Sequence, residues 1–218
     1  MVESAESPSS FWEPLGFWFS EQGLSEQTVV LSYWAHMLAI SVFLFLIPLS
    51  KHMHLVMAVP NVFYHDAGPI ARMRPLATGD DGKAVPLEDL DIDSFGVSTY
   101  NQYSWRQLID GWSCTSCARC QDVCPAYASG KGLNPMQVIH DVRNYANDHA
   151  PILLSGGQPD ETMLERITEE AVWACTTCNA CVDVCPLYIE HVPKLTDLRR
   201  NAMMETMEYP EVLNTAMG

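Results

Sequence analysis

Eight cysteines lie in two short stretches of the 218-residue chain, and none lies elsewhere. The stretches run from Trp112 to Tyr127 and from Trp173 to Tyr188, 61 residues apart, and both contain C-x2-C-x2-C-x3-C-P. This spacing is the cysteine pattern of bacterial iron–sulfur proteins. A cubane cluster has four irons that each take one thiolate, and three cysteines at three-residue steps can surround one cluster from a single loop. The pattern therefore predicts two [4Fe–4S] clusters.

The fourth cysteine of each motif is followed by proline and points away from the loop that holds the first three. In two-cluster ferredoxins this cysteine binds the other cluster, so we expect the two motifs to exchange their fourth ligands. The predicted ligands of cluster 1 are Cys114, Cys117, Cys120 and Cys185. The predicted ligands of cluster 2 are Cys175, Cys178, Cys181 and Cys124.

Zinc and disulfides are the alternative uses of such cysteines. Structural zinc sites usually show two C-x2-C pairs separated by a longer loop and do not need a third cysteine three residues on. Disulfides suit small secreted domains, but cysteines this close in the chain cannot pair within a motif without strain. Iron–sulfur clusters are therefore favoured, and their thiolates indicate a reducing compartment.

A membrane-spanning helix is predicted upstream of the cysteines. From Gln27 to Ser50 there is no Asp, Glu, Lys or Arg, and about 20 apolar residues suffice to span a bilayer. The first fifty residues contain no Lys or Arg, whereas Lys51, Arg72, Arg74 and Lys83 follow the span. The positive-inside rule therefore places the cluster domain on the cytoplasmic side of the membrane. The aromatic residues of 11–19 are expected at the water–lipid interface, with a small soluble core cluster as the alternative.

Two histidines on this segment, His36 and His54, are 18 residues apart. In a continuous helix, 18 residues make five full turns and about 27 Å of rise, so both side chains would share one face near opposite sides of the bilayer. This arrangement suits axial ligands of two haem b groups, which makes haem b a further predicted cofactor. The alternative is that both histidines only make contacts at the interface, because haem also needs a second ligand from another helix.

The remaining pattern predicts an all-α protein. Helices are expected at 104–112, at 161–173, at 194–207 and from Asn134-Pro135 onward, where proline suits the first turn and apolar residues recur at helical spacing. We expect three parts: an interfacial segment and transmembrane helix (1–59), a linker (60–103), and an α-helical ferredoxin domain (104–218). The formal net charge of −15 argues against a nucleic-acid partner.

The cysteine module with its long helical spacing resembles the α-helical ferredoxin domain of succinate dehydrogenase iron–sulfur subunits and of heterodisulfide reductase-like proteins. With the upstream S-Y-W-A-H and P-L-S-K-H-M-H-L segment, the chain from about residue 11 is similar to membrane-bound heterodisulfide reductase-related iron–sulfur oxidoreductases. In those proteins a nitrate reductase γ-like haem b domain precedes the ferredoxin domain. Further membrane helices and a cysteine-rich part with C-C-G motifs complete them. This sequence contains neither, so the resemblance implies either a subunit of a larger complex or a portion of a longer protein.

The resemblance also implies a function. We expect an electron-transfer subunit that relays electrons between a soluble flavoprotein, such as electron transfer flavoprotein, and a membrane quinone or haem b, with a C-C-G-containing reductase as a further partner. The chain shows no nucleophile or acid–base constellation of its own. The alternative is a fragment of a catalytic subunit of the heterodisulfide reductase or glycolate oxidase type. A purely structural role, in which the clusters anchor a peripheral assembly, is a third interpretation.

Overall fold

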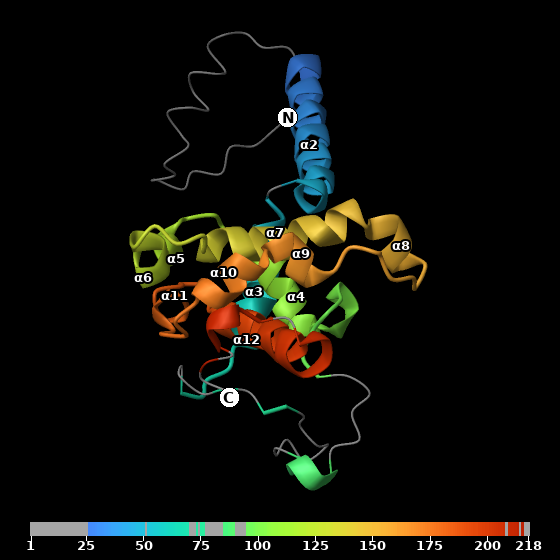
Figure 1. The fold of residues 1–218 in the computed structure, drawn as a ribbon. Coiled ribbons are helices and arrows are strands. Elements are labelled where there is room, and N and C mark those ends of the chain that lie inside the picture. The colour runs from blue at the N-terminus through green and yellow to red at the C-terminus, as the bar shows by residue number, and fades with distance from the viewer. Residues whose placement is uncertain are drawn as a thin grey trace. The chain divides into compact units, whose positions relative to one another are not determined.

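The computed structural model describes residues 26–50, 52–69, 73, 75–76, 85–89, 95–207, 209–213 and 215. Within these residues the chain forms helices and no strands, which confirms the predicted all-α fold (Figure 1). It divides into two compact units, Met1–Lys51 and His52–Gly218. Two predictions lie outside the described residues: the interfacial role of 11–19, and the basic residues Lys51, Arg72, Arg74 and Lys83 on which the predicted orientation depends.

The first unit contains α2 (Glu26–Leu46). Its residues Gln27–Leu46 are long and apolar enough to cross a membrane, with a mean hydropathy of 2.0, and none of them is buried by protein. The hydroxyl groups of Ser32 and Ser41 donate hydrogen bonds to carbonyl oxygens of the same helix, at 2.8 and 2.9 Å. Such bonds satisfy a polar group that faces lipid. α2 is thus a candidate membrane helix.

The α-helix of this span ends earlier than expected. After Leu46 the chain forms a 3-10 turn, η1 (Ile47–Leu49), because Pro48 lacks the backbone donor that an α-helix needs. A separate helix, α3 (Met53–Phe63), begins in the second unit. The expected first part, 1–59, therefore contains α2 and the start of a separate helix, α3.

Short helices build the second unit, where they pack together around α4 and α7 (Figure 1). The α-helices after α3 are α4 (Trp105–Ser113), α5 (Arg119–Asp122), α6 (Pro125–Ala128), α7 (Pro135–Asp148), α8 (Ala150–Leu154), α9 (Met163–Ile167), α10 (Glu169–Ala174), α11 (Ala180–Asp183) and α12 (His191–Asn201). The 3-10 helices of this unit are η2 (Leu87–Asp89), η3 (Tyr100–Gln102) and η5 (Glu211–Leu213), and η4 (Ala202–Thr206) is a π-helix.

The predicted helix at Asn134-Pro135 is confirmed as α7. The side-chain oxygen of Asn134 accepts hydrogen bonds from the backbone N–H groups of Met136 and Gln137, at 3.0 and 3.3 Å. This is the N-cap arrangement that makes asparagine favourable before a first-turn proline. α7 then buries one face, from Val138 to Tyr145, in the core of the second unit.

The predicted helix over 161–173 is instead two helices, α9 and α10. They meet at Thr168, whose backbone has φ 75° and ψ 137° and whose hydroxyl accepts a hydrogen bond from the Ala171 N–H at 3.4 Å. The side chain thus caps the new helix while the positive φ ends the previous one. The break directs α10 toward the second cysteine motif.

Much of the expected linker belongs to the folded unit. Asn61 of α3 is buried, and its side-chain amide donates to Asp110 Oδ1 at 3.1 Å and to the Leu187 carbonyl at 2.9 Å. Val97 is buried as well, and its N–H donates to the Asp197 carbonyl at 3.0 Å. In the structure α3 and residues 95–103 thus pack with the cysteine-bearing helices, and the boundaries expected after residues 59 and 103 stay predictions.

Candidate metal centres

The two cysteine motifs follow the same backbone path. Cys114 ends α4 and Cys175 ends α10, with nearly equal dihedral angles (φ −63°, ψ 122° and φ −66°, ψ 124°). In each motif two residues between the cysteines then take a left-handed conformation, and a one-turn helix follows as α5 or α11. The sequence repeat is therefore also a structural repeat.

The left-handed residues of these loops are not glycines. They are Ser116, Ala118, Thr177 and Asn179, with φ between 55° and 62°. Each such residue costs about 1–3 kcal/mol and persists where a site requires it. Alternation of left- and right-handed residues turns successive backbone N–H groups toward one centre, which forms a nest for anions. In the second motif the Thr177 N–H donates to Cys175 Sγ at 3.4 Å.

Two cavities collect the eight cysteines, four in each. The first cavity is lined by Cys114, Cys117, Cys120 and Cys185. The second cavity is lined by Cys124, Cys175, Cys178 and Cys181. Each cavity thus receives its fourth cysteine from the other motif, and the structure brings together the two sets that the sequence pattern predicts.

The cavities are close to each other. Cys120 and Cys181 are buried in one small apolar cluster with Val192, and a charge on the Cys120 sulfur would raise the pKa of Cys181. His191 lines both cavities. By contrast, Cys117 and Cys178 are exposed, so each cavity reaches the protein surface at one cysteine.

Burial dominates the acid–base properties of the thiols. It raises the pKa of Cys120 and of Cys181 to about 12, with neighbouring thiolates adding to the effect. It also raises the pKa values of Cys114, Cys175 and Cys185. Backbone N–H groups oppose this rise: Ser116 acts on Cys114, and Leu187 and Ile189 act on Cys185. Four thiolates in such a cavity therefore require cationic metal to compensate their charge.

These donor sets fit iron–sulfur clusters. Each cavity offers four soft sulfur ligands, backbone N–H donors and an apolar wall that includes Met136 in the first case and Leu133 and Leu195 in the second. In the part of the chain that the structure describes, no three His, Cys, Asp or Glu side chains gather closely enough for one metal ion. A cluster holds its irons at separate corners, so its four thiolates stand further apart than the ligands of one tetrahedral zinc.

A cation lies beside each cavity. Arg143 of α7 lowers the pKa of Cys114, and Arg199 of α12 lowers that of Cys175, although burial outweighs both effects. The Arg199 guanidinium donates to the carbonyl oxygens of Val172 and Cys175 and stacks over the Trp173 ring, 5.4 Å from its centroid. Arg199 therefore holds the end of α10, from which the second motif starts.

His140 contacts the first motif. Its Nε2 lies 3.8 Å from Cys114 Sγ and 3.0 Å from Ser116 Oγ. No sequence pattern pointed to His140 or Arg199 as part of the site, because their partners lie 24 to 27 residues away in the chain.

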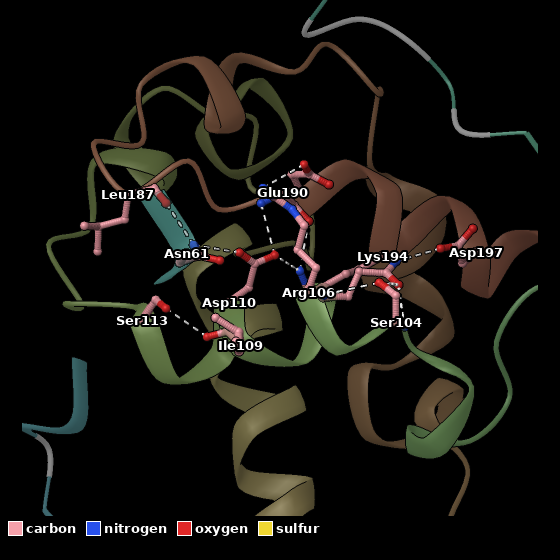
Figure 2. Close-up of polar contacts among 11 residues, drawn as sticks. Asn61, Ser104, Arg106, Ile109, Asp110, Ser113, Leu187, Glu190, Lys194 and Asp197 are labelled. Atoms are coloured by element: carbon pink, nitrogen blue, oxygen red, sulfur yellow. Dashed lines mark hydrogen bonds and ion pairs between the residues drawn. The ribbon is translucent and has the colours of Figure 1, made fainter. Parts of the chain in front are cut away.

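A buried polar network fixes the helices behind the first cavity (Figure 2). Asp110 of α4 and Lys194 of α12 form an ion pair with side chains that are almost fully buried. Asp110 also accepts from the amide of Asn61 and from the backbone N–H of Glu190, while Arg106 pairs with the Glu190 carboxylate at 3.0 Å. The network thereby ties α3, α4 and α12 to the chain that leaves Cys185.

The predicted haem ligands lie in different units. His36 is an exposed residue of α2, and His54 lies in α3, which is a separate helix. The prediction that both side chains share one helix face, about 27 Å apart, assumed one continuous helix. Because the two histidines lie in separate helices, that spacing no longer supports haem ligation. Haem ligation by His36 and His54 stays a prediction without it.

Comparison with known proteins agrees with these centres. Residues 106–186 match a family model described as a 4Fe-4S dicluster domain. The EtfAB:quinone oxidoreductase of Syntrophomonas wolfei is 30% identical over 203 residues, which cover 83% of this chain and 27% of that protein. A probable membrane-anchored ferredoxin of Chromohalobacter salexigens is 34% identical over 148 residues, covering 58% of this chain and 22% of that protein.

A component of the ferredoxin:CoB-CoM heterodisulfide reductase of Methanosarcina mazei is 32% identical over 105 residues, covering 47% of this chain and 53% of that component. The chain spans only 22% to 30% of the length of three of the curated relatives it matches. No solved structure gives a significant match. The homologues are iron–sulfur oxidoreductases, including components of heterodisulfide reductases, and this chain carries a 4Fe–4S dicluster domain and a candidate membrane helix.

Proposed function

We propose that this chain is a membrane-anchored electron-transfer subunit that holds two [4Fe–4S] clusters. Cysteines 114, 117, 120 and 185 would bind cluster 1, and cysteines 175, 178, 181 and 124 would bind cluster 2. The observation that carries the proposal is the pair of adjacent cavities, each lined by four cysteines of which one comes from the other motif. Four thiolates are the ligand set that a cubane cluster needs.

The two centres would carry electrons one at a time. Each cluster takes one electron without a bond forming or breaking, so the protein has to bind the cluster, exclude water and bring the two centres close. Cys120 and Cys181 meet in the same apolar cluster between the cavities. The exposed Cys117 and Cys178 mark where each cluster would come nearest to the surface. Electrons would then enter the protein near one of these two cysteines and leave it near the other.

The partners are inferred from chemistry and from the relatives. A reduced flavin and a quinone each exchange two electrons, so two one-electron centres in series suit a connection between a soluble flavoprotein and a membrane quinone. The Syntrophomonas relative is named an EtfAB:quinone oxidoreductase, and a quinone is therefore part of its printed activity. We propose the same classes of partner here, with the cluster domain on the cytoplasmic side and anchored by α2. Haem b at His36 and His54, and a C-C-G-containing reductase as a neighbour, stay predictions.

A catalytic role is the second candidate. The chain covers about a quarter of several longer oxidoreductases, so a fragment of a heterodisulfide reductase-like or glycolate oxidase-like subunit is the alternative. Purification of the native complex with its associated chains would distinguish the two, since the relay requires separate chains to supply the catalytic centre.

Cysteine-to-serine variants test the exchange of ligands. If the fourth ligands cross, Cys185→Ser and Cys117→Ser change the same electron paramagnetic resonance (EPR) signal of the reduced protein, and Cys124→Ser and Cys178→Ser change the other. If each motif binds its own cluster, Cys185→Ser pairs with Cys178→Ser instead. Retention of both native signals in every variant would show that the cysteines are not the ligands.

A further inference from the structure

His191 is the one described residue that lines both cysteine cavities. It is the first residue of α12 and lies six positions after Cys185. Only 2% of its surface is exposed. His191 thus borders the space that a group in either cavity would occupy.

One nitrogen of the buried His191 ring has no well-formed hydrogen bond within the described part of the chain. Its Nδ1 is buried and has no well-formed hydrogen bond to a described residue, although the Ile189 backbone acts on the ring. Burial of a polar atom without a partner is unfavourable, which makes such atoms rare in folded proteins. Nδ1 of a neutral imidazole either donates or accepts a hydrogen bond. An iron–sulfur cluster offers only hydrogen-bond acceptors, namely sulfide and thiolate sulfur.

The surrounding network keeps the ring in place. Asp110 accepts from the Glu190 N–H at 3.3 Å, and Lys194 donates to the Glu190 carbonyl at 3.1 Å, so the residue preceding His191 is held on both sides. Arg106 pairs with the Glu190 side chain at 3.0 Å. The position of His191 therefore depends on the same buried contacts that join α4 to α12.

Burial disfavours the charged form of the imidazole. It lowers the pKa of His191 to about 4, with the Lys194 charge as the next cause, while Asp110 and a backbone contact at Ile189 oppose the shift. A neutral imidazole carries one proton, and the hydrogen bond that one nitrogen makes determines the tautomer.

We propose that His191 donates an Nδ1–H hydrogen bond to a cluster sulfur at the boundary between the two cavities and so helps to set the reduction potential of that cluster. The inference rests on the proposed function, because it requires clusters in both cavities. A hydrogen bond to sulfur stabilises the more negative, reduced state. Removal of the bond therefore lowers the potential of the cluster that accepts it.

Redox titration of the purified full-length chain, followed by EPR, tests the proposal. In His191→Leu the donor is absent, and we expect the reduction equilibrium of one cluster to shift about tenfold toward the oxidised form, which is about 59 mV for a one-electron couple. In His191→Asn the side-chain amide places an N–H near the position of Nδ1, and the potential should stay close to that of the unchanged protein. His149→Asn is the control, because His149 bonds Glu161 at 2.8 Å and lines neither cavity.

Labelling with ¹⁵N-histidine gives a second readout. Because His140 lies 3.8 Å from Cys114 Sγ, the labelled protein carries His140→Asn throughout. Pulsed EPR of this reduced protein should show a nitrogen coupling that is lost when His191→Leu or His191→Asn is added but kept when His149→Asn is added. If His191→Leu fails to assemble clusters, the comparison of the protein with and without His191→Asn decides by the same coupling.

The outcomes separate the inference from the proposed function. If the unsubstituted chain assembles no clusters, the proposed function fails and the inference fails with it. If clusters assemble but the His191 variants titrate like the unsubstituted protein and lose no nitrogen coupling, the hydrogen bond is disproved while the electron-transfer role stands.

Discussion

At the level of single residues, each cysteine cavity has its own arginine. Arg143 lies beside the first cavity and Arg199 beside the second, each close enough to favour the thiolate of the first cysteine in its motif. A positive charge near a cluster favours the reduced state, which carries one more negative charge. Substitution of one arginine at a time should therefore change the reduction potential of one cluster and not that of the other.

We predict that Arg199→Gln lowers the potential of cluster 2 by about 59 mV or less, a tenfold shift or less in its reduction equilibrium. Arg143→Gln should lower cluster 1 instead, and Arg199→Lys, which keeps the charge, should change the potential less than Arg199→Gln. Redox titration with EPR detection measures both clusters at once. Equal shifts of both clusters in either variant would contradict the assignment of one arginine to each site.

The buried pair of Asp110 and Lys194 supports the fold more than the chemistry. Loss of one partner leaves the other charge buried and unpaired, which costs about 3–5 kcal/mol. We therefore expect Lys194→Met to destabilise the protein strongly and the Asp110→Asn, Lys194→Met double variant to lose less than the sum of the single losses. Denaturant unfolding measures both.

The control for this prediction is Arg166→Gln. Arg166 pairs with Asp148 and Glu161, whose side chains are 55% and 33% exposed, and exposed pairs contribute about 0–1 kcal/mol. If Lys194→Met cost no more than Arg166→Gln, the buried pair would not stabilise the fold as argued.

At the level of whole elements, residues 95–98 before α4 pack closely against α12. Gly96 has φ 73°, and a Cβ at this position would lie 2.2 Å from the Asp197 carbonyl oxygen. We expect Gly96→Ala to destabilise the protein by more than the roughly 1–2 kcal/mol that a left-handed alanine costs by itself. Thermal unfolding measures the loss.

Gly130→Ala is the matched control, because Gly130 has φ 78° but no atom within 4 Å of a Cβ. It carries the backbone cost without the steric clash. Equal losses of stability in the two variants would show that residues 95–98 can move away from α12 without cost.

Local patterns predicted some elements and missed others. The start of α7 could be predicted because its signal is local. Asn134 caps the backbone N–H groups of the first turn, and Pro135 suits the first helical position. The break at Thr168 was missed because residues 161–173 contain neither glycine nor proline. The packing of α3 was missed as well, since the partners of Asn61 lie 49 and 126 residues further along the chain. The cysteine repeat indicated which thiols meet, whereas the ring of His191 and the cations beside the cavities follow from tertiary packing alone.

At the scale of the whole molecule, the division after Lys51 separates an apolar helix from a unit with its own core. We predict that a chain starting at His52 is released from membranes and retains both clusters, because the cysteines, α3 and the polar network all lie in the second unit. The full chain should instead resist extraction by carbonate. Fractionation of membranes checks both statements, and a full chain that carbonate releases would contradict a spanning α2.

The number of clusters follows from the iron and acid-labile sulfide content per chain, measured on anaerobically purified protein. Two [4Fe–4S] clusters predict about eight iron atoms and about eight sulfides for each chain. Zinc without labile sulfide, or about four iron atoms with four of the eight thiols free, would contradict the account.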